Sequence, residues 1–281
     1  MTETLTVYEP DNALKRGYLN IFREIGRDLK NNRWLTWQLF KRDFFAAYKQ
    51  SFIGILWAFI VPLISIGTFV ILQQSGIFNY GSIAVAYPIY AVLGMAFWSL
   101  FSTGLIGCSN SLVAAGPTII KINFSKKSLV IASIGQSLVS FLIQFIVLCI
   151  LFVVYGVVPN IAILLVIPLM IPIVLLTLGL GFLVSILNGI MRDAGNLISV
   201  LITFLMFLTP VLYEIPNEGI LWQISRINPV YYLISAPREL ILSGTMSNWI
   251  GFMISGILSV VIFIVCLMIF HLSETRVTER I

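Results

Sequence analysis

Side chains that could do covalent or metal chemistry are few in this sequence. The single histidine is His271, and the three cysteines, Cys108, Cys149 and Cys266, lack the spacing of a metal site, so we interpret them as small core residues. The Asp and Glu residues are scattered and form no carboxylate cluster of the kind that a lipid-sugar transferase would need. No Gly-x-x-x-x-Gly-Lys-Ser/Thr loop for nucleotide phosphates occurs. Enzymatic chemistry is therefore not the expected function.

Aromatic and basic residues form the more informative patterns. The segment Arg33–Gln50 places Trp and Phe residues at helical spacing between basic residues. This pattern predicts a helix that lies in the lipid headgroups, and the same helix could also form a socket for a cytoplasmic partner. A second basic segment, Val113–Ser128, is either a loop that only fixes topology or a short helix pressed into a soluble subunit.

The elements that carry these residues must be membrane helices. Hydrophobic residues make up 59% of the chain and charged residues only 10%, against about 25% charged residues in a soluble domain. No signal peptide is evident, so the first apolar segment is expected to act as an uncleaved insertion signal. We predict an all-α integral membrane fold with six transmembrane helices. These are Phe52–Leu72, Pro88–Cys108, Leu129–Tyr155, Ile161–Leu187, Leu197–Leu212 and Trp249–Phe270.

The distribution of Lys and Arg orients these spans. With six spans, 15 of the 17 basic residues fall on one side, which places both termini in the cytoplasm. The last external loop, Tyr213–Asn248, contains apolar clusters between Pro, Asn and Gly, so we expect two short re-entrant helices there. The expected domains are a cytoplasmic arm over 1–50, a transmembrane domain over 51–271 and a cytoplasmic tail over 272–281.

The predicted spans have no ionisable residue near their centres. Ion-coupled transporters, pumps and voltage sensors need such groups at membrane depth, so coupling to protons or sodium is not expected. If the chain takes part in active transport, its energy must come from another polypeptide. A scaffold or passive channel would need no such partner, and that alternative stays open at this point.

The segment Arg42–Leu63, RDFFAAYKQSFIGILWAFIVPL, resembles the start of the permease subunits of ABC-2 type polysaccharide exporters. Further similar motifs follow in order: KINFSKKSL, TPVLYEIP, NPVYYLI and ETRVTERI. The resemblance covers nearly the whole chain, and within the family it is strongest to the exporters of O-antigen for lipopolysaccharide. Permeases for teichoic acid or capsule share the pattern, and so in part do ABC-2 exporters of drugs or other lipids.

The resemblance implies a homodimer of permeases in the bacterial inner membrane, joined to two copies of a separate ATP-binding cassette ATPase. It implies that an undecaprenyl-type lipid-linked polysaccharide moves from cytoplasm to periplasm through a channel at the dimer centre. ATP and Mg²⁺ would be held by the partner, so this chain is expected to bind no cofactor, no metal and no nucleic acid.

Two sets of site residues are expected from this function. Aromatic faces can pack on sugar rings without fixing a register, so aromatic residues are the candidates for the channel lining, with anchoring in the lipid interface as the alternative. These are Trp57, Phe59, Tyr87, Phe97, Trp98, Phe101, Tyr231 and Tyr232. The expected contacts with the ATPase subunit come from the cytoplasmic arm and the second basic segment. They are Trp37, Lys41, Arg42, Asp43, Lys49, Pro117, Lys121, Lys126 and Lys127.

Overall fold

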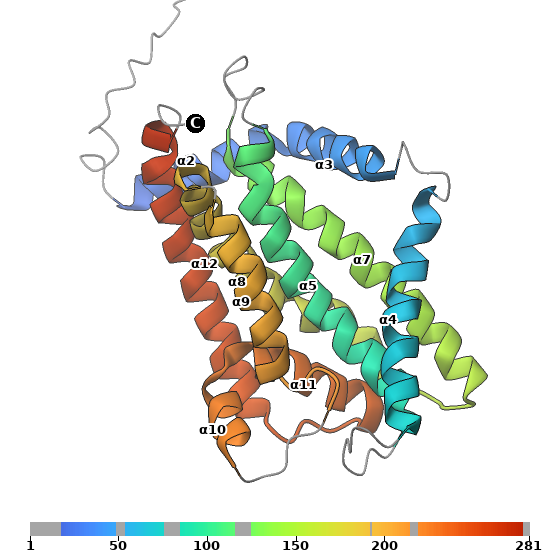
Figure 1. The fold of residues 1–281 in the computed structure, drawn as a ribbon. Helices are drawn as coiled ribbons and strands as arrows, with labels where there is room; N and C mark the ends of the chain where they lie inside the picture. Colours follow the sequence, from blue (N-terminus) through green and yellow to red (C-terminus); the bar gives the residue numbers. More distant parts are fainter. Residues whose placement is uncertain are drawn as a thin grey trace, which may run out of the picture.

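The computed structural model describes residues 18–48, 54–75, 85–115, 125–191, 193–213 and 219–277. These residues form ten α-helices and two short 3-10 helices and contain no strand, which confirms the all-α prediction. Four long helices make the body of the molecule: α5 (Tyr87–Ala114), α7 (Lys127–Val154), α8 (Val166–Ile190) and α12 (Trp249–Val277). α5 packs between α7 and α8, and α12 packs on α8 (Figure 1).

Four of the six predicted spans are confirmed as helices long and apolar enough to cross a membrane. They are α5, α7, α12 and α8 together with the 3-10 helix η2 (Ile161–Leu165) that precedes it. The other two predicted spans correspond to shorter apolar helices in α4 (Trp57–Gln74) and α9 (Asp193–Leu208). α9 has 16 residues and is therefore about 24 Å long, while the hydrocarbon layer is about 30 Å thick. The count of six stays a prediction for these two helices.

Proline, asparagine and glycine mark the ends of several helices. Pro88 stands in the first turn of α5, where its missing N–H removes no helical hydrogen bond. The Asn160 side chain accepts a hydrogen bond from the backbone N–H of Ala162 and begins η2. Asn228 does the same for α11 (Pro229–Ser243), and Gly244 ends that helix with a φ of 78° that favours glycine.

α5 is the centre of the bundle. Most of its side chains are buried between α7, α8, α9 and α11, because the helix is apolar on nearly every face. Glycines allow the neighbouring helices to approach closely. A Cβ atom at Gly179 of α8 would lie 2.8 Å from the backbone N and Cα of Phe263 in α12, so only glycine fits there without a shift.

Shorter helices cover both ends of the bundle. α2 (Tyr18–Asn31) and α3 (Arg33–Tyr48) lie at one end, and α3 packs on α7 (Figure 1). At the other end α10 (Ile220–Ile227) is followed by α11, which lies across the bundle and packs on α12, α5 and α8. The two short helices predicted in the last loop therefore form, while their entry into the membrane and the domain boundaries stay predictions.

Candidate conduit and coupling surfaces

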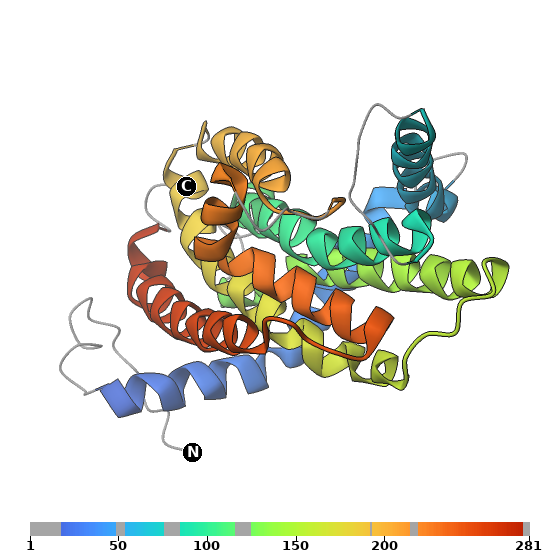
Figure 2. The ribbon, with the colours of Figure 1, turned by 90° about the horizontal axis from the view of Figure 1, so that it is seen from below.

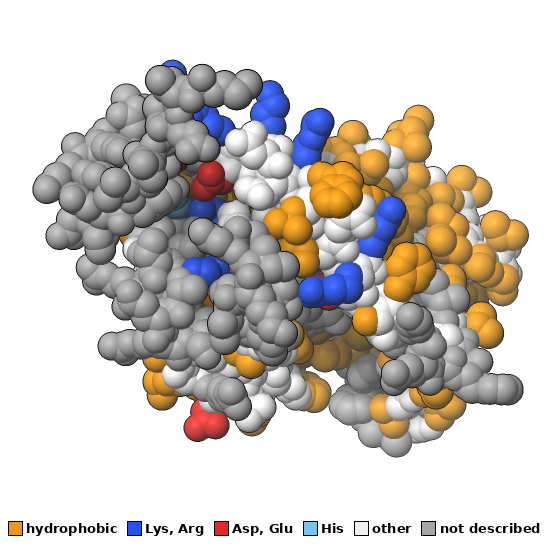
Figure 3. Space-filling view, turned by 90° about the horizontal axis from the view of Figure 1, so that it is seen from above, with side chains coloured by type: hydrophobic (Ala, Val, Ile, Leu, Met, Phe, Trp, Pro, Cys, Tyr) orange, Lys and Arg blue, Asp and Glu red, His pale blue; other side chains and the backbone are white. Residues whose placement is uncertain are grey.

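α3 presents an exposed aromatic and basic surface at one end of the bundle. Trp34 and Trp37 are 69% and 51% exposed, and Phe45 is 63% exposed. The Lys41 ammonium lies 5.2 Å from the centre of the Trp37 ring, a cation–π distance. Figure 3, which looks onto this end, shows basic side chains standing among hydrophobic ones over α3. Exposed indoles next to cations suit either a headgroup layer or a protein partner.

The opposite face of α3 holds the helix on the bundle. Leu39 is buried, and Phe40 packs against α7 so closely that a Cβ atom at Gly135 would lie 2.3 Å from its ring. Farther along α3, the Arg42 Nε donates a hydrogen bond to Asp43 Oδ1 at 2.8 Å, and both side chains are about half exposed. These two neighbouring residues, both expected to contact the ATPase, thus form an ion pair on the surface of the arm.

The remaining residues that were predicted to contact the ATPase are partly buried in the bundle and partly outside the described residues. Lys126 and Lys127 are buried at the start of α7, and the Lys127 Nζ lies 3.2 Å from Asp28 Oδ2 of α2. Lys127 therefore ties the arm to the bundle through this ion pair. Lys49, Pro117 and Lys121 lie outside the described residues. Contact of any of these residues with an ATPase stays a prediction.

Four of the predicted lining aromatics lie together in the core of the single chain. Tyr87, Phe97, Trp98 and Phe101 of α5 are all less than 5% exposed. The rings of Trp98 and Phe101 are 5.6 Å apart, and Phe97 meets Phe141 of α7 edge-on at 5.4 Å. In this arrangement the four rings pack helices against one another.

The other four aromatics are spread over the molecule. Trp57, at the start of α4, is 42% exposed, and Phe59 packs partly on the core. Tyr231 and Tyr232 of α11 form an edge-on pair with ring centres 4.9 Å apart, and the Tyr232 hydroxyl donates to the Arg226 carbonyl. The structure therefore does not bring the eight aromatics to one surface of the protomer.

A line of polar residues on α5 and α9 was missed by the sequence reasoning. Thr103 and Asn110 are exposed on α5, seven residues apart and thus on the same face, and Thr203 is exposed on α9. α4 and α9 both contact α5, and seen along the bundle they stand apart on the same side of it (Figure 2). Hydroxyl and amide groups on the open side of a membrane helix usually face a partner or water, so this face is the best candidate for a conduit wall.

A buried amide joins this face at the end of the bundle that carries α2 and α3. The Asn188 Nδ2 of α8 donates to the Ser109 carbonyl at 3.0 Å and to Asn110 Oδ1 at 3.2 Å, both on α5. Its Oδ1 accepts a hydrogen bond of 2.9 Å from the backbone N–H of Gly195 in α9. Asn188 therefore connects three helices through all of its side-chain hydrogen-bonding groups except one lone pair.

A buried arginine holds the opposite end of α9. Arg238 of α11 is 4% exposed, and its guanidinium donates to the carbonyls of Val211 at 2.7 Å and Pro210 at 3.2 Å. The same group lies 3.9 Å from the centre of the Tyr90 ring of α5. The sequence reasoning placed Arg238 in an external loop and did not single it out, because its partners lie 27 and 28 residues away in the chain.

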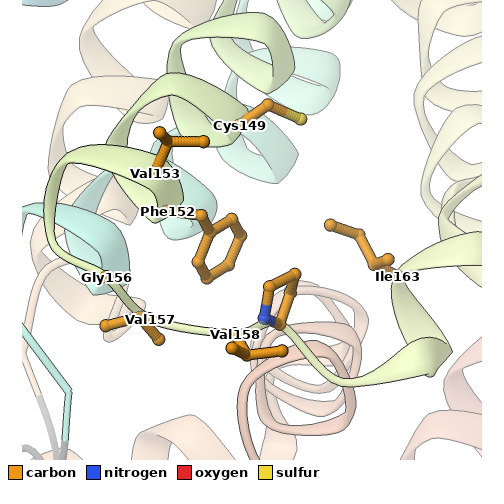
Figure 4. A pocket seen from close by; sticks show the side chains of 8 residues that line it. Cys149, Phe152, Val153, Gly156, Val157, Val158 and Ile163 are labelled. Carbon is orange, nitrogen blue, oxygen red and sulfur yellow. The ribbon is translucent and has the colours of Figure 1, made fainter.

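An apolar pocket of roughly 400 Å³ lies where α7 ends and η2 begins (Figure 4). Its lining comprises Cys149, Phe152, Val153, Gly156, Val157, Val158, Pro159 and Ile163. Apart from the thiol, these side chains offer no group for acid–base chemistry. Within the described ranges, no group of three or more His, Cys, Asp or Glu residues could hold a metal ion.

The sequence matches the ABC-2 type transporter family over residues 35–242. The chain belongs to the ABC-2 type transporter family. Among curated proteins, it is 24% identical over 262 residues to the O-antigen export system permease protein RfbA of Myxococcus xanthus, an alignment that covers 91% of this chain and 98% of that protein. Two proteins of the same name from Klebsiella pneumoniae are 26% and 27% identical over 85% of this chain and 91% of their own length.

The family resemblance seen in the sequence is thus confirmed. An ABC-2 permease is a transport component, and the long apolar helices of this one make it a multi-pass membrane protein. The family match covers the arm from residue 35 onward, the polar face of α5 and α9, and α11 as far as residue 242. The surfaces described above therefore belong to the part of the chain that the family shares, whereas α2 precedes it.

Proposed function

We propose that this chain is the transmembrane subunit of an exporter that moves a lipid-linked O-antigen polysaccharide out of the cytoplasm. Two copies of the chain would form the conduit, and a separate ATPase would drive transport. The name shared by the three relatives supports the cargo, and the match to the ABC-2 family supports the class of machine.

The observation that carries the proposal is the polar face of α5 and α9. A single protomer exposes Thr103 and Asn110 on α5 and Thr203 on α9, within helices that are mostly apolar. The Thr103 and Thr203 hydroxyls donate to the backbone carbonyls of Ser99 and Ser199, which leaves their oxygen lone pairs to accept hydrogen bonds from water or a polymer. A second protomer facing this side would enclose these groups in a polar path. A neutral polymer rich in hydroxyls can slide along such a path, because no charged group holds it.

The proposed orientation rests on the distribution of charge, and the proposed energy source rests on the lack of a phosphate-binding loop. The end of the bundle that carries α2 and α3 bears most of the basic residues, which supports a cytoplasmic position for it. The sequence has no phosphate-binding loop, so ATP would be hydrolysed by a partner bound at this end. We assign the first contact to the exposed residues Trp37, Lys41, Arg42 and Asp43 of α3.

A movement of α3 would be transmitted to the bundle through the contacts that hold α2 and α3 on α7. Phe40 packs on Gly135 of α7, and the Asp28–Lys127 ion pair joins α2 to the same helix. Both contacts lie at the start of α7, which packs along α5. A displacement of the arm is therefore expected to change the position of α7 relative to the polar face.

The test is a variant in which Thr103→Val and Thr203→Val remove two hydroxyls with almost no change in shape. We expect surface O-antigen to fall severalfold while the amount of permease in the membrane stays unchanged. Thr245→Val, in the loop between α11 and α12, is the matched control. Surface O-antigen equal to that of the native chain in the double variant would remove the α5–α9 face from the conduit.

A further inference from the structure

The charges of α2 are separated between its two faces. On the face toward the bundle, Ile25 is buried, and the two acids contact basic side chains of other helices. The Asp28 carboxylate lies 3.2 Å from Lys127 of α7, and Glu24 Oε2 lies 4.0 Å from His271 Nε2 of α12. The acidic groups of α2 are thus turned inward, where they hold the helix on α7 and α12.

The outward face of α2 carries only positive charge. Arg23, Arg27 and Lys30 are all exposed, and their spacing of four and three residues aligns them along one side of the helix. None of the three forms an ion pair with any residue in the part of the chain that the structure describes. Three unpaired cations in a line attract an anionic surface.

The position of α2 indicates which anionic surface these three cations would meet. Seen from the opposite end of the molecule, α2 runs beside α12 and is not covered by the helices of the bundle (Figure 2). The contact between Glu24 and His271 places α2 beside the end of the apolar part of α12. If the apolar part of α12 spans the membrane, lipid would fill the space next to α2, and α2 would lie at the depth of the headgroups.

We propose that Arg23, Arg27 and Lys30 form a binding site for the phosphate groups of anionic phospholipids in the leaflet at this end. Guanidinium groups bind phosphate oxygens in pairs of charge-assisted hydrogen bonds, and Lys30 adds a point charge. Each basic residue near an anionic membrane surface strengthens attraction by about fivefold. Bound headgroups would anchor the outer side of α2 while Asp28 and Glu24 anchor its inner side.

The experiment uses the full chain in bilayers of phosphatidylcholine that contain a minority of phosphatidylglycerol. After gentle extraction, native mass spectrometry counts the lipids of each kind that remain on the protein. We expect phosphatidylglycerol to be enriched over its share of the bilayer by at least about fivefold. The triple variant Arg23→Gln, Arg27→Gln and Lys30→Gln should bring the retained lipids close to the composition of the bilayer.

Two comparisons separate the site from general attraction and from misfolding. The matched variant Arg33→Gln, Lys41→Gln and Arg42→Gln removes three exposed cations of α3 and should lower the enrichment by less than the α2 variant does, whereas Arg23→Lys with Arg27→Lys should keep it. In the native chain, enrichment should fall as salt approaches about 1 M, where the Debye length is about 3 Å. An unchanged lipid ratio in the α2 triple variant overturns the proposal, and so does an equal loss in the α3 variant. If the α2 triple variant loses a bound ATPase but keeps the lipid enrichment, the three cations bind a protein instead of lipid.

Discussion

The Asn188 side chain offers the sharpest single test of how the polar face is held. Asn188 is 3% exposed and makes hydrogen bonds to Ser109, Asn110 and Gly195, so that one amide joins α8 to α5 and α9. Leucine has nearly the same size and none of these hydrogen-bonding groups. The substitution Asn188→Leu therefore removes three hydrogen bonds without leaving a cavity.

The expected loss of stability follows from the burial of each partner. A typical hydrogen bond contributes about 1 kcal/mol, and leaving the buried Ser109 carbonyl or the half-buried Gly195 N–H without its partner adds to that cost. The bond to the exposed Asn110 counts for less, because water can replace it. A total of about 3 kcal/mol corresponds to a fall of roughly 5–10 °C in melting temperature for a chain of this size.

The assay is thermal unfolding of the purified permease in detergent, followed by the reaction of buried thiols with a fluorogenic maleimide. Cys108 and Cys266 are buried and report the opening of the bundle, whereas Cys149 is exposed and gives a constant background. Asn196→Leu, an exposed asparagine one residue after Gly195, is the matched control and should melt within about 1 °C of the native chain. If Asn188→Leu melts together with this control, the amide does not hold α9 and the reasoning fails.

Three further predictions concern the other contacts. Arg238→Met should lower the melting temperature by more than Arg238→Lys, because methionine loses both the charge and the bonds to Pro210 and Val211; equal losses would show that the charge is irrelevant. Asp28→Asn should reduce the free energy that holds α2 on α7 by about 1–2 kcal/mol, which is less than the loss of a fully buried pair because Asp28 is 43% exposed. The same change should make Trp37 more accessible to iodide quenching, and unchanged quenching would contradict the role of the ion pair. Trp98→Ala with Phe101→Ala should abolish polymer export and destabilise the core, whereas Trp98→Phe should preserve both export and stability. Full export in the double alanine variant would show that these rings have no role in transport.

The long helices were predictable from the sequence, because an apolar segment long enough to cross a membrane has few stable structures other than a helix. α5, α7, α8 and α12 lie where hydropathy placed them, with ends that extend by a few residues. The two short helices after α9 were also predictable, since Asn228 and Pro229 mark the start of α11 and glycine marks its end. α2 was missed as a separate element, although its apolar residues recur every three or four positions, as in an amphipathic helix.

The direction of individual side chains was much harder to predict. α5 is apolar on almost every side, so the periodicity of Phe97, Trp98 and Phe101 cannot distinguish the core from a channel wall. The ion pair of Asp28 with Lys127 and the bonds of Asn188 and Arg238 join residues far apart in the chain. Such contacts depend on how the helices pack, and no local pattern reveals them.

The proposed function requires that this chain form a path for a lipid-linked polysaccharide and that an ATPase drive the transport. The most direct measurement reconstitutes the permease with its ATPase subunit in vesicles that contain the lipid-linked polymer, and follows the polymer with a lectin on the side away from the ATPase. We expect the polymer to become accessible only when both proteins and ATP are present, and more slowly with Thr103→Val and Thr203→Val. Polymer that crosses at the same rate without this chain, or without ATP, would contradict it.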